Sequence, residues 1–255
     1  LPYSNVWFSS GNNEITRGVK NERNILGELG WRMVWDSGNV ELTAYAARWK
    51  NRTLMSGKYR RLDADDVRYM ITGLDALHKG VEASFYQRIG RRVEFKAFAS
   101  IGDWRWMNDV NAIIYDDYTG LEAGRVNVYC DGLPVADAPQ TQMGANLRLN
   151  TAHGFSMGVD VQYNDRMYAD FDPSTRNKAE DRATSYRIPG YHLLGADFSW
   201  TMGGKHTLNV FLRADNLLDV SYIERGKDGA THDLESFRGY WGFGRVISFG
   251  MRYRF

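Results

Sequence analysis

Sulfur ligands are nearly absent from this sequence, because Cys130 is the only cysteine among 255 residues. A single thiol excludes an internal disulfide and a cysteine-based metal cluster, and we expect Cys130 to be an inert loop thiol. The five histidines form neither an HExxH nor a His-x-His pattern, which leaves zinc and haem sites unsupported. Acidic clusters at 63–66, 116–117 and 170–172 do not match an EF-hand calcium loop. We therefore predict no metal site and no cofactor.

Net charge and long apolar runs are also missing. The 32 basic and 31 acidic residues leave a formal charge of +1, so there is no global field to attract nucleic acid. Mean hydropathy is −0.49, and no run approaches the roughly 20 apolar residues of a spanning helix. A spanning β-barrel remains possible, because its strands expose only every second side chain to lipid. The opening residues lack the basic and apolar regions of a secretion signal, so we expect a processed protein or a fragment.

Aromatic residues, in contrast, are abundant. They make up 14% of the chain and include 15 Tyr and 8 Trp. Tyr and Trp gather in the interfacial girdles of membrane barrels, although carbohydrate-binding β-domains are also rich in aromatic residues. This composition favours a barrel without deciding the question.

The last ten residues, VISFGMRYRF, alternate apolar and mostly polar side chains with the period of a β-strand. The same alternation predicts about ten strands of roughly ten residues each, at 3–8 (partial), 26–35, 40–49, 79–88, 92–103, 140–150, 155–168, 191–201, 206–216 and 246–255. The polar faces of these strands carry charged, amide and glycine residues. A soluble sandwich and a wide barrel share this pattern.

The connections between the predicted strands alternate strictly in length. Short glycine-containing turns are expected at 36–39, 89–92, 151–154 and 202–205. Between them lie long connections, at 9–25, 50–78, 104–139, 169–190 and 217–245. This alternation of short and long connections is typical of up-and-down barrels in bacterial outer membranes, which have short periplasmic turns and long extracellular loops. We therefore predict an all-β, antiparallel, up-and-down transmembrane barrel with a periplasmic C-terminus and outward-facing loops.

Several motifs resemble the C-terminal region of TonB-dependent outer-membrane receptors, particularly those of the Bacteroidetes. They are GELGWR at 27–32, GLDALHKGVE at 73–82, ADNLLDVSYI at 214–223 and GYWGFGRVISFGMRYRF at 239–255. NLLD followed by Tyr222 is similar to the NLFD-x-x-Y element of that family, with Leu218 in place of the commoner Phe. Within GLDALHKG, we expect His78 to fix the entry of a strand through hydrogen bonds rather than to bind a metal.

The resemblance implies a plugged barrel of about 22 strands, of which residues 1–255 would form the last ten. The plug domain, the N-terminal strands and the segment that engages TonB would then lie outside this chain. Expected partners are the TonB–ExbB–ExbD complex, outer-membrane lipid, the barrel assembly machinery and a possible surface lipoprotein. The assembly machinery would read a C-terminal signal made by Phe249, Met251, Tyr253 and Phe255.

The implied activity is active import of a scarce nutrient such as a ferric siderophore, haem, cobalamin or a glycan, and not enzymatic catalysis. Aromatic loop residues are the candidate ligand contacts, namely Trp104, Trp106, Tyr115, Tyr118, Phe171, Tyr186 and Phe237. Tyr240 and Trp241 also lie in the predicted loops, and Tyr168 is the last residue of the predicted strand at 155–168. Packing in the girdle or between loops is the favoured explanation for several of these aromatic residues, Tyr168, Tyr240 and Trp241 above all.

Two other functions fit a stand-alone barrel of ten strands. An omptin-like outer-membrane protease would require carboxylates and a histidine at the outer rim, and His232–Asp233 is the only adjacent pair of these types. A passive porin would require a charged constriction loop and no plug.

Overall fold

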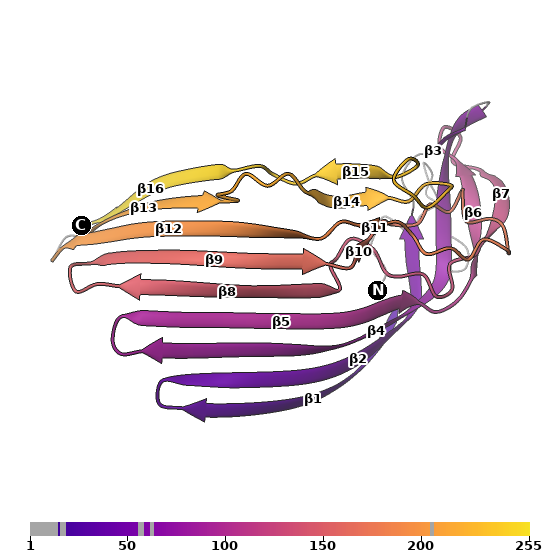
Figure 1. Cartoon of the computed structure of the whole chain (residues 1–255). Coiled ribbons are helices and arrows are strands. Elements are labelled where there is room, and N and C mark those ends of the chain that lie inside the picture. Colours follow the sequence, from indigo (N-terminus) through magenta and orange to yellow (C-terminus); the bar gives the residue numbers. More distant parts are fainter. Residues whose placement is uncertain (1–14, 16–18, 56–58, 62–63, 205–206) are drawn as a thin grey trace.

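Nine long strands form one curved antiparallel sheet, in the order β1-β2-β4-β5-β8-β9-β12-β13-β16 (Figure 1). The structure, a computed structural model, describes residues 15, 19–55, 59–61, 64–204 and 207–255. Each strand pairs with its successor in chain order, which confirms the all-β up-and-down arrangement. The bounds are β1 Arg23–Trp35, β2 Gly38–Met55, β4 Ala64–Ile89, β5 Val93–Trp106, β8 Thr141–Asn150, β9 Phe155–Asp165, β12 Tyr191–Gly203, β13 Thr207–Asp215 and β16 Val246–Arg254. The partial strand expected at 3–8 lies outside the described residues.

Three of the expected tight turns join successive strands along one end of the sheet (Figure 1), and the fourth, expected at 202–205, lies partly outside the described residues. Only two residues separate β1 from β2, three separate β4 from β5, and four separate β8 from β9. Gly154 in the third of these turns has a φ of +77°, and a Cβ there would lie 2.1 Å from the carbonyl oxygen of Thr201. Glycine is therefore required at this position by conformation and by space.

The opposite end of the sheet differs from the prediction, because much of the expected loop sequence is strand. The connection expected at 50–78 is occupied largely by the 18-residue β2 and the 26-residue β4, which run on past the predicted ends. A short strand, β3 (Tyr59–Arg61), pairs with β4. The connection expected at 104–139 contains β6 (Val110–Asp116) and β7 (Glu122–Val128), which extend the sheet beside β4.

Of the three other long connections, the one expected at 9–25 lies mostly outside the described residues, and short ribbons stand at or within the other two. β10 (Met167–Tyr168) pairs with β11 (Arg187–Ile188) across the connection at 169–190. β14 (Ile223–Lys227) pairs with β15 (Arg238–Trp241) within 217–245. The loops are therefore partly ordered by backbone hydrogen bonds of their own.

The strand register separates an apolar face from a polar face. One row of paired residues runs across seven strands on a single face, through Phe249, Leu212, Phe198, Met157, Leu149, Val93 and Ile89. The adjacent row on the opposite face runs through Ser248, Arg213, Asp197, Gly158, Arg148, Glu94 and Arg88. Apolar side chains on the first face stay exposed, and Met251 retains 72% of its accessible surface. A sheet with one fully exposed apolar face is suited to contact with lipid.

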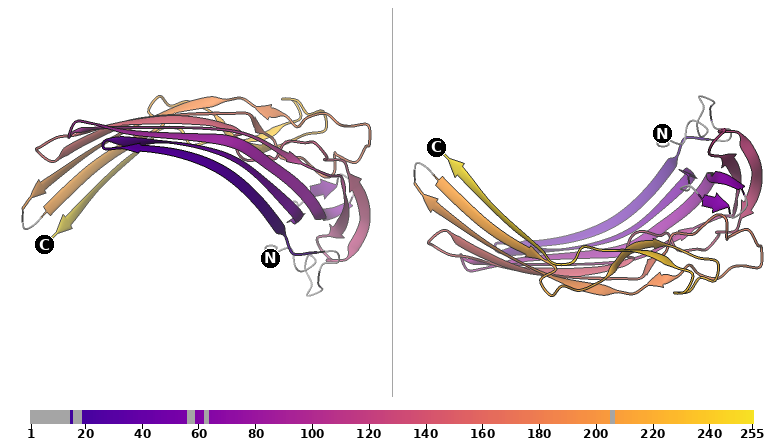
Figure 2. Two further views of the ribbon diagram at one scale, coloured as in Figure 1. Left: turned by 90° about the horizontal axis from the view of Figure 1, so that it is seen from below. Right: turned by 90° about the horizontal axis from the view of Figure 1, so that it is seen from above.

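The buried core lies at the loop end of the sheet. Its largest cluster joins the outer parts of β4, β5 and β6 to residues near Leu133 and Phe171. Seen from below and from above, the sheet is strongly curved, and the β6–β7 hairpin turns away from the line of the long strands (Figure 2). This extension and the loops over it therefore form a small globular cap on a sheet that is otherwise one layer thick.

Both edges of the described sheet are open. β1 pairs only with β2, and β16 pairs only with β13. Unpaired backbone groups are prohibitive in hydrocarbon, where each costs several kcal/mol. No helix within the described ranges is long and apolar enough to cross a membrane.

Candidate functional site

An ion network lies on the polar face, where β8, β9, β12 and β13 run side by side. Arg148 donates to the Asp197 carboxylate at 2.7 Å, and Arg213 contacts Asp160 at 3.3 Å and Asp197 at 3.7 Å. Gly158, between Arg148 and Asp197 in the row, leaves room for this pair, because a Cβ there would lie 2.5 Å from an Asp197 oxygen. The polar face thus presents fixed charges of both signs, as expected of a water-filled lumen.

A row of aromatic residues continues the polar face toward the loop end. The indole Nε1 of Trp104 donates to the hydroxyl of Tyr45 at 2.9 Å, and the Trp104 ring stacks on His78 with ring centroids 5.3 Å apart. The hydrogen-bonding role expected for His78 at a strand entry is wrong. His78 lies inside β4, its Nε2 is buried without a hydrogen-bond partner, and its contacts are stacking contacts.

Farther out, Arg52 lies between two tryptophans. Its guanidinium carbon is 5.5 Å from the ring centroid of Trp49 and 5.5 Å from that of Trp106. Trp106 packs edge-on against Phe171, with centroids 6.1 Å apart, and both side chains are buried. Arg52, Trp106 and Phe171 line a cavity of about 230 Å³ at the junction of the sheet and the loops.

The candidate ligand residues do not form one patch. Trp104 is half-buried, Trp106, Tyr115 and Phe171 are buried, and Tyr118 retains 94% of its surface. Tyr186 and Phe237 come from different loops and meet with ring centroids 4.7 Å apart. Trp241 and Tyr240 are exposed on β15. Of the candidates, Trp106 and Phe171 share one cavity, and the ligand role of the whole set stays a prediction.

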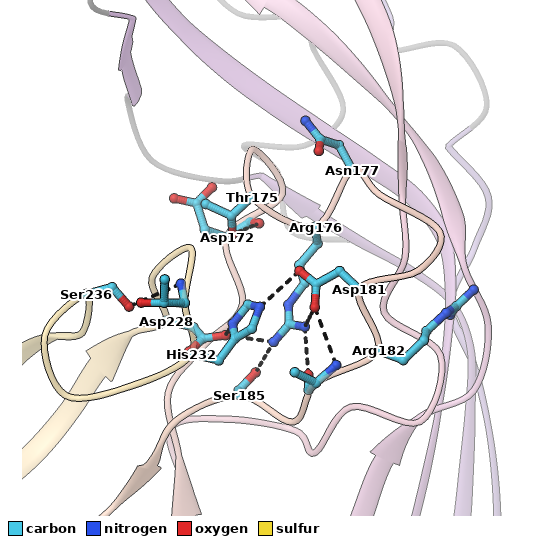
Figure 3. A network of polar contacts seen from close by, with 12 residues as sticks. Asp172, Thr175, Arg176, Asn177, Asp181, Arg182, Ser185, Asp228, His232 and Ser236 are labelled. Atoms are coloured by element: carbon cyan, nitrogen blue, oxygen red, sulfur yellow. Dashed lines mark hydrogen bonds and ion pairs between the residues drawn. The ribbon is translucent and has the colours of Figure 1, made fainter.

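A buried ion network fastens two loops together (Figure 3). Arg176, from the 169–190 loop, donates to the Asp228 carboxylate at 2.7 Å, and neither side chain has any exposed surface. Arg176 also donates to the carbonyl oxygen of Ala183 at 2.7 Å. The other Asp228 oxygen accepts from the backbone N–H of Tyr186 at 3.0 Å. Asp228 therefore ties its own loop, 217–245, to both ends of the 176–186 segment.

His232 completes this network with contacts to two carboxylates. Its Nδ1 lies 2.6 Å from Asp228, and its Nε2 lies 3.0 Å from Asp181 (Figure 3). The imidazole thus bridges one carboxylate from each of the two loops, Asp181 from 169–190 and Asp228 from 217–245. The adjacent Asp233 takes no part, since it accepts from Thr231 and Ser236 within its own loop.

The NLLD segment acts as a structural turn before the last loop. Asn216 is buried with a φ of +49°, and its side-chain amide donates to the carbonyl oxygens of Val220 and Phe243. Its side-chain oxygen accepts from the Val220 N–H at 2.9 Å. Asp219 accepts from the Arg245 N–H at 2.8 Å. The motif thus pins the beginning of the last loop to its end, just before β16.

Cys130 lies in the core of the loop end and has no exposed surface. Burial raises the pKa of its thiol to about 12, assisted by the nearby carboxylates of Asp109 and Asp131. Within the part of the chain that the structure describes, no three His, Cys, Asp or Glu side chains converge as a possible metal site.

Comparison with known families decides the identity of this sheet. The family described as "TonB dependent receptor-like, beta-barrel" matches residues 2–217. This chain belongs to the TonB-dependent receptors. The family confirms the resemblance drawn from the GELGWR, GLDALHKG and NLLD segments. A comparison with curated proteins finds no significant match.

Solved structures of TonB-dependent receptors share the fold. The ferric yersiniabactin uptake receptor FyuA of Yersinia pestis matches 92% of this chain with a TM-score of 0.60 and 16% identity. FpvA of P. aeruginosa, solved with bound ferric pyoverdine, matches 98% with a TM-score of 0.57 and 13% identity. The copper transporter OprC matches 98% with a TM-score of 0.65 and 12% identity. The chain spans 30%, 29% and 35% of these proteins respectively, about a third of each.

Sequence reasoning missed two arginines that the structure places at the centre of the loop end. Arg52 and Arg176 both fall in stretches that the sequence assigns to loops. Their partners are remote, since 52 residues separate Arg176 from Asp228. Trp106, one of the two tryptophans beside Arg52, gave one usable signal, because it alternates with Trp104 in the strand period.

Proposed function

We propose that this chain forms part of the barrel of an outer-membrane transporter that imports a scarce nutrient, such as a ferric siderophore, haem, cobalamin or a glycan. The two-faced sheet is the observation that carries the proposal. Apolar rows suit the lipid side, and the row through Arg148, Asp197 and Arg213 suits a hydrated lumen. Open edges at β1 and β16 call for further strands, which the proposal assigns to the rest of a barrel of about 22 strands with its plug.

The topology supports an orientation in which the short turns and Phe255 face the periplasm and the loops face outward. The proposed energy source is TonB–ExbB–ExbD, acting on a region outside this chain. Outer-membrane lipid and the barrel assembly machinery are further proposed partners, and a surface lipoprotein could cover the loops. The similar structures are named for ferric yersiniabactin, ferric pyoverdine and copper, which favours metal chelates as the first substrates to test.

The cap at the loop end is the proposed first contact for substrate. Trp104 and Trp106, which lines the cavity, both lie on β5, and this strand continues from the proposed lumen wall into the cap. A substrate bound in the cap could therefore move along β5 into the lumen. Tyr118, Tyr186 and Phe237 are proposed as additional contacts around it.

The burial of His232 opposes the protease alternative. The His232 side chain is 7% exposed and the Asp228 side chain is fully buried, and both are committed to ion pairs. Hydrolysis requires an acid–base group within reach of substrate and water. We therefore propose no catalytic role for this receptor segment.

The test is growth and uptake in a strain lacking the gene. The strain is grown with a single source of the limiting nutrient, which is a ferric siderophore, haem, cobalamin or a glycan. Growth is expected to fail on one of these four and to return when the gene is restored. A proton uncoupler distinguishes active import from a porin, because TonB-driven uptake requires the proton gradient. Uptake that depends on the gene but resists the uncoupler would support the porin. Unchanged growth on all four sources would contradict import of these nutrients.

A further inference from the structure

Six segments of the chain meet around the cavity at the loop end. Residues of β2, β4 and β5 line it together with 135–137, 170–173 and Lys227 of β14. Its volume is about 230 Å³, and eight of its twelve lining residues are apolar. A cavity of roughly 150 Å³ is large enough to hold benzene. This cavity therefore has room for one ring and a small polar group.

Arg52 brings an unpaired positive charge to this cavity. Its guanidinium lies against the rings of Trp49 and Trp106, 5.5 Å from each ring centroid, and these contacts restrict its motion. Among the described residues, no carboxylate pairs with Arg52, and its buried Nε has no hydrogen-bond acceptor. Most other arginines of the cap have such a partner, as Arg182 has in Asp109.

Trp106 adds a second donor without a partner. Its side chain is 4% exposed, and its Nε1 is buried without an acceptor. Buried donors in folded proteins are nearly always paired with protein or solvent acceptors. Because Trp106 and Arg52 line the same cavity, one oxygen-bearing group inside it would supply acceptors for both.

The remaining charges of the cavity do not compete for Arg52. Asp170 is paired with Lys227, and Asp137, whose pKa is raised by burial of its carboxyl and by Asp170, forms no ion pair with Arg52 among the described residues. Apolar side chains of Ile71, Val135 and Phe171 occupy much of the remaining lining. The cavity thus combines one available cation with apolar walls.

We propose that this cavity binds the carboxylate of a small ligand with an apolar body, and that Arg52 is the residue that pairs with the carboxylate. The planar guanidinium matches a carboxylate with two parallel hydrogen bonds. The apolar body would lie against Ile71, Val135 and Phe171. The inference rests on the proposed import function, because the carboxylate would belong to the imported substrate.

Benzoate is the probe, and the uncharged benzamide is its matched control. Binding to the purified full-length receptor that contains this chain is measured by calorimetry and by quenching of tryptophan fluorescence. Benzoate is expected to bind more tightly than benzamide. Arg52→Gln is expected to weaken benzoate binding at least about tenfold and to leave benzamide unchanged. Arg52→Lys retains the charge without the planar fork and is expected to bind with intermediate affinity.

Arg225→Gln is the control variant. Arg225 also lies over an aromatic ring, that of Tyr240 at 5.3 Å, but it does not line the cavity. Its benzoate affinity is expected to equal that of the unmodified receptor. Trp106→Phe, which keeps the ring packing and removes the N–H, provides a second variant should Arg52→Gln fail to fold. Heat-modifiable migration in gels reports folding for each variant.

The results separate this inference from the proposed function. Equal binding of benzoate and benzamide, or equal benzoate binding by Arg52→Gln and Arg225→Gln, would overturn the carboxylate site. Gene-dependent, uncoupler-sensitive uptake alongside that result would leave the import function standing. Selective benzoate binding in a receptor whose deletion affects no uptake would instead retain the site and reject import.

Discussion

Arg176 and Asp228 form a 2.7 Å ion pair in which neither side chain has any exposed surface, although 52 residues separate them. Two charges removed from water repay their desolvation only when the geometry and the additional hydrogen bonds are good. Here Asp228 also accepts from Tyr186 and contacts His232, and Arg176 donates to Ala183. The pair is thus the centre of a clasp that fastens the 169–190 loop to the 217–245 loop.

Arg176→Met should loosen this clasp. The substitution leaves the Asp228 carboxylate buried without its guanidinium, and breaking a buried pair in this way costs about 3–5 kcal/mol. We expect faster hydrogen exchange in the 176–186 segment of the receptor. Arg182→Met is the control, because the Arg182–Asp109 pair is exposed and such pairs contribute only about 0–1 kcal/mol. Equal acceleration in the two variants would contradict the clasp.

The clasp should also weaken in acid. Burial opposes the charged form of Asp181, but the hydrogen bond and the charge of His232 outweigh it, so the pKa of Asp181 lies below its ordinary value. A carboxylate with a depressed pKa contributes stability above its unfolded pKa and loses that contribution as the pH falls through the folded one. We expect exchange protection factors for 176–186 to hold down to about pH 4 and to fall below it.

Asp181→Asn is the matched variant for this acid dependence. It keeps the shape of the side chain and cannot titrate. Its protection should be lower near neutral pH, because His232 loses one charged partner, and should fall less steeply in acid. An acid dependence identical to that of the unmodified receptor would show that Asp181 does not carry it.

Cys130 should react slowly with alkylating reagents. Burial raises its pKa from an ordinary 9.0 to about 12, and only the thiolate is nucleophilic. This difference lowers the thiolate fraction at pH 8 about a thousandfold, before access is considered. Mass spectrometry after iodoacetamide treatment should find Cys130 unmodified in the folded receptor and modified in denaturant. A cysteine placed at the exposed Lys178 should react in both states, and rapid labelling of folded Cys130 would sink the prediction.

The alternation of apolar and polar residues predicts the strands that have one apolar and one polar face, and it does not predict the strands of the cap. Segments such as 155–163 alternate because one face meets lipid and the other a polar interior, so their strand period is visible locally. β6 has no such alternation, because Ala112 and Ile114 are buried in one cluster while Ile113 and Tyr115 are buried around a second. A strand covered on both faces shows a continuous apolar run instead of alternation. For this reason strand period alone places residues 112–115 in a loop.

The candidate site was less predictable than the fold for a related reason. Trp104 and Trp106 could be selected by residue type, but burial and partners are set by segments far away in the sequence. Phe171 contacts Trp106 although 64 residues lie between them, and Arg52 gains the second of its two tryptophan neighbours from β5. Composition identifies residues able to bind a ligand, whereas tertiary contacts decide which of them line a cavity.

Phe255→Ala should reduce the amount of receptor in the outer membrane. Phe255 is 97% exposed at the end of the apolar face, and its ring lies 6.3 Å from that of Tyr253. The alternation through Phe249 and Met251 resembles the signal read by the assembly machinery, so removing its last ring should slow assembly. Immunoblots of outer-membrane fractions measure the yield. Arg254→Ala, one residue earlier on the polar face, should assemble normally, and equal yields for both variants would argue against the signal.

Asn216→Ala should destabilise the turn before the last loop through two separate effects. Its buried amide satisfies Val220 and Phe243, and removing one partner from buried polar groups costs about 1–3 kcal/mol. Its φ of +49° adds roughly 1–2 kcal/mol for a residue with a Cβ and no local hydrogen bond. The measurement is the urea concentration at which half of the receptor is unfolded, followed by the gel migration that distinguishes folded from unfolded barrels.

Comparison of Asn216→Gly with Asn216→Ala separates these effects, because glycine adopts positive φ without strain and lacks the same hydrogen bonds. Asn216→Gly should therefore fall between the unmodified receptor and Asn216→Ala. Leu218→Ala is the control, since that side chain is 58% exposed and takes no part in the turn's hydrogen bonds. A midpoint for Leu218→Ala as low as that of Asn216→Ala would mean that apolar contact, not the asparagine turn, holds the last loop against β16.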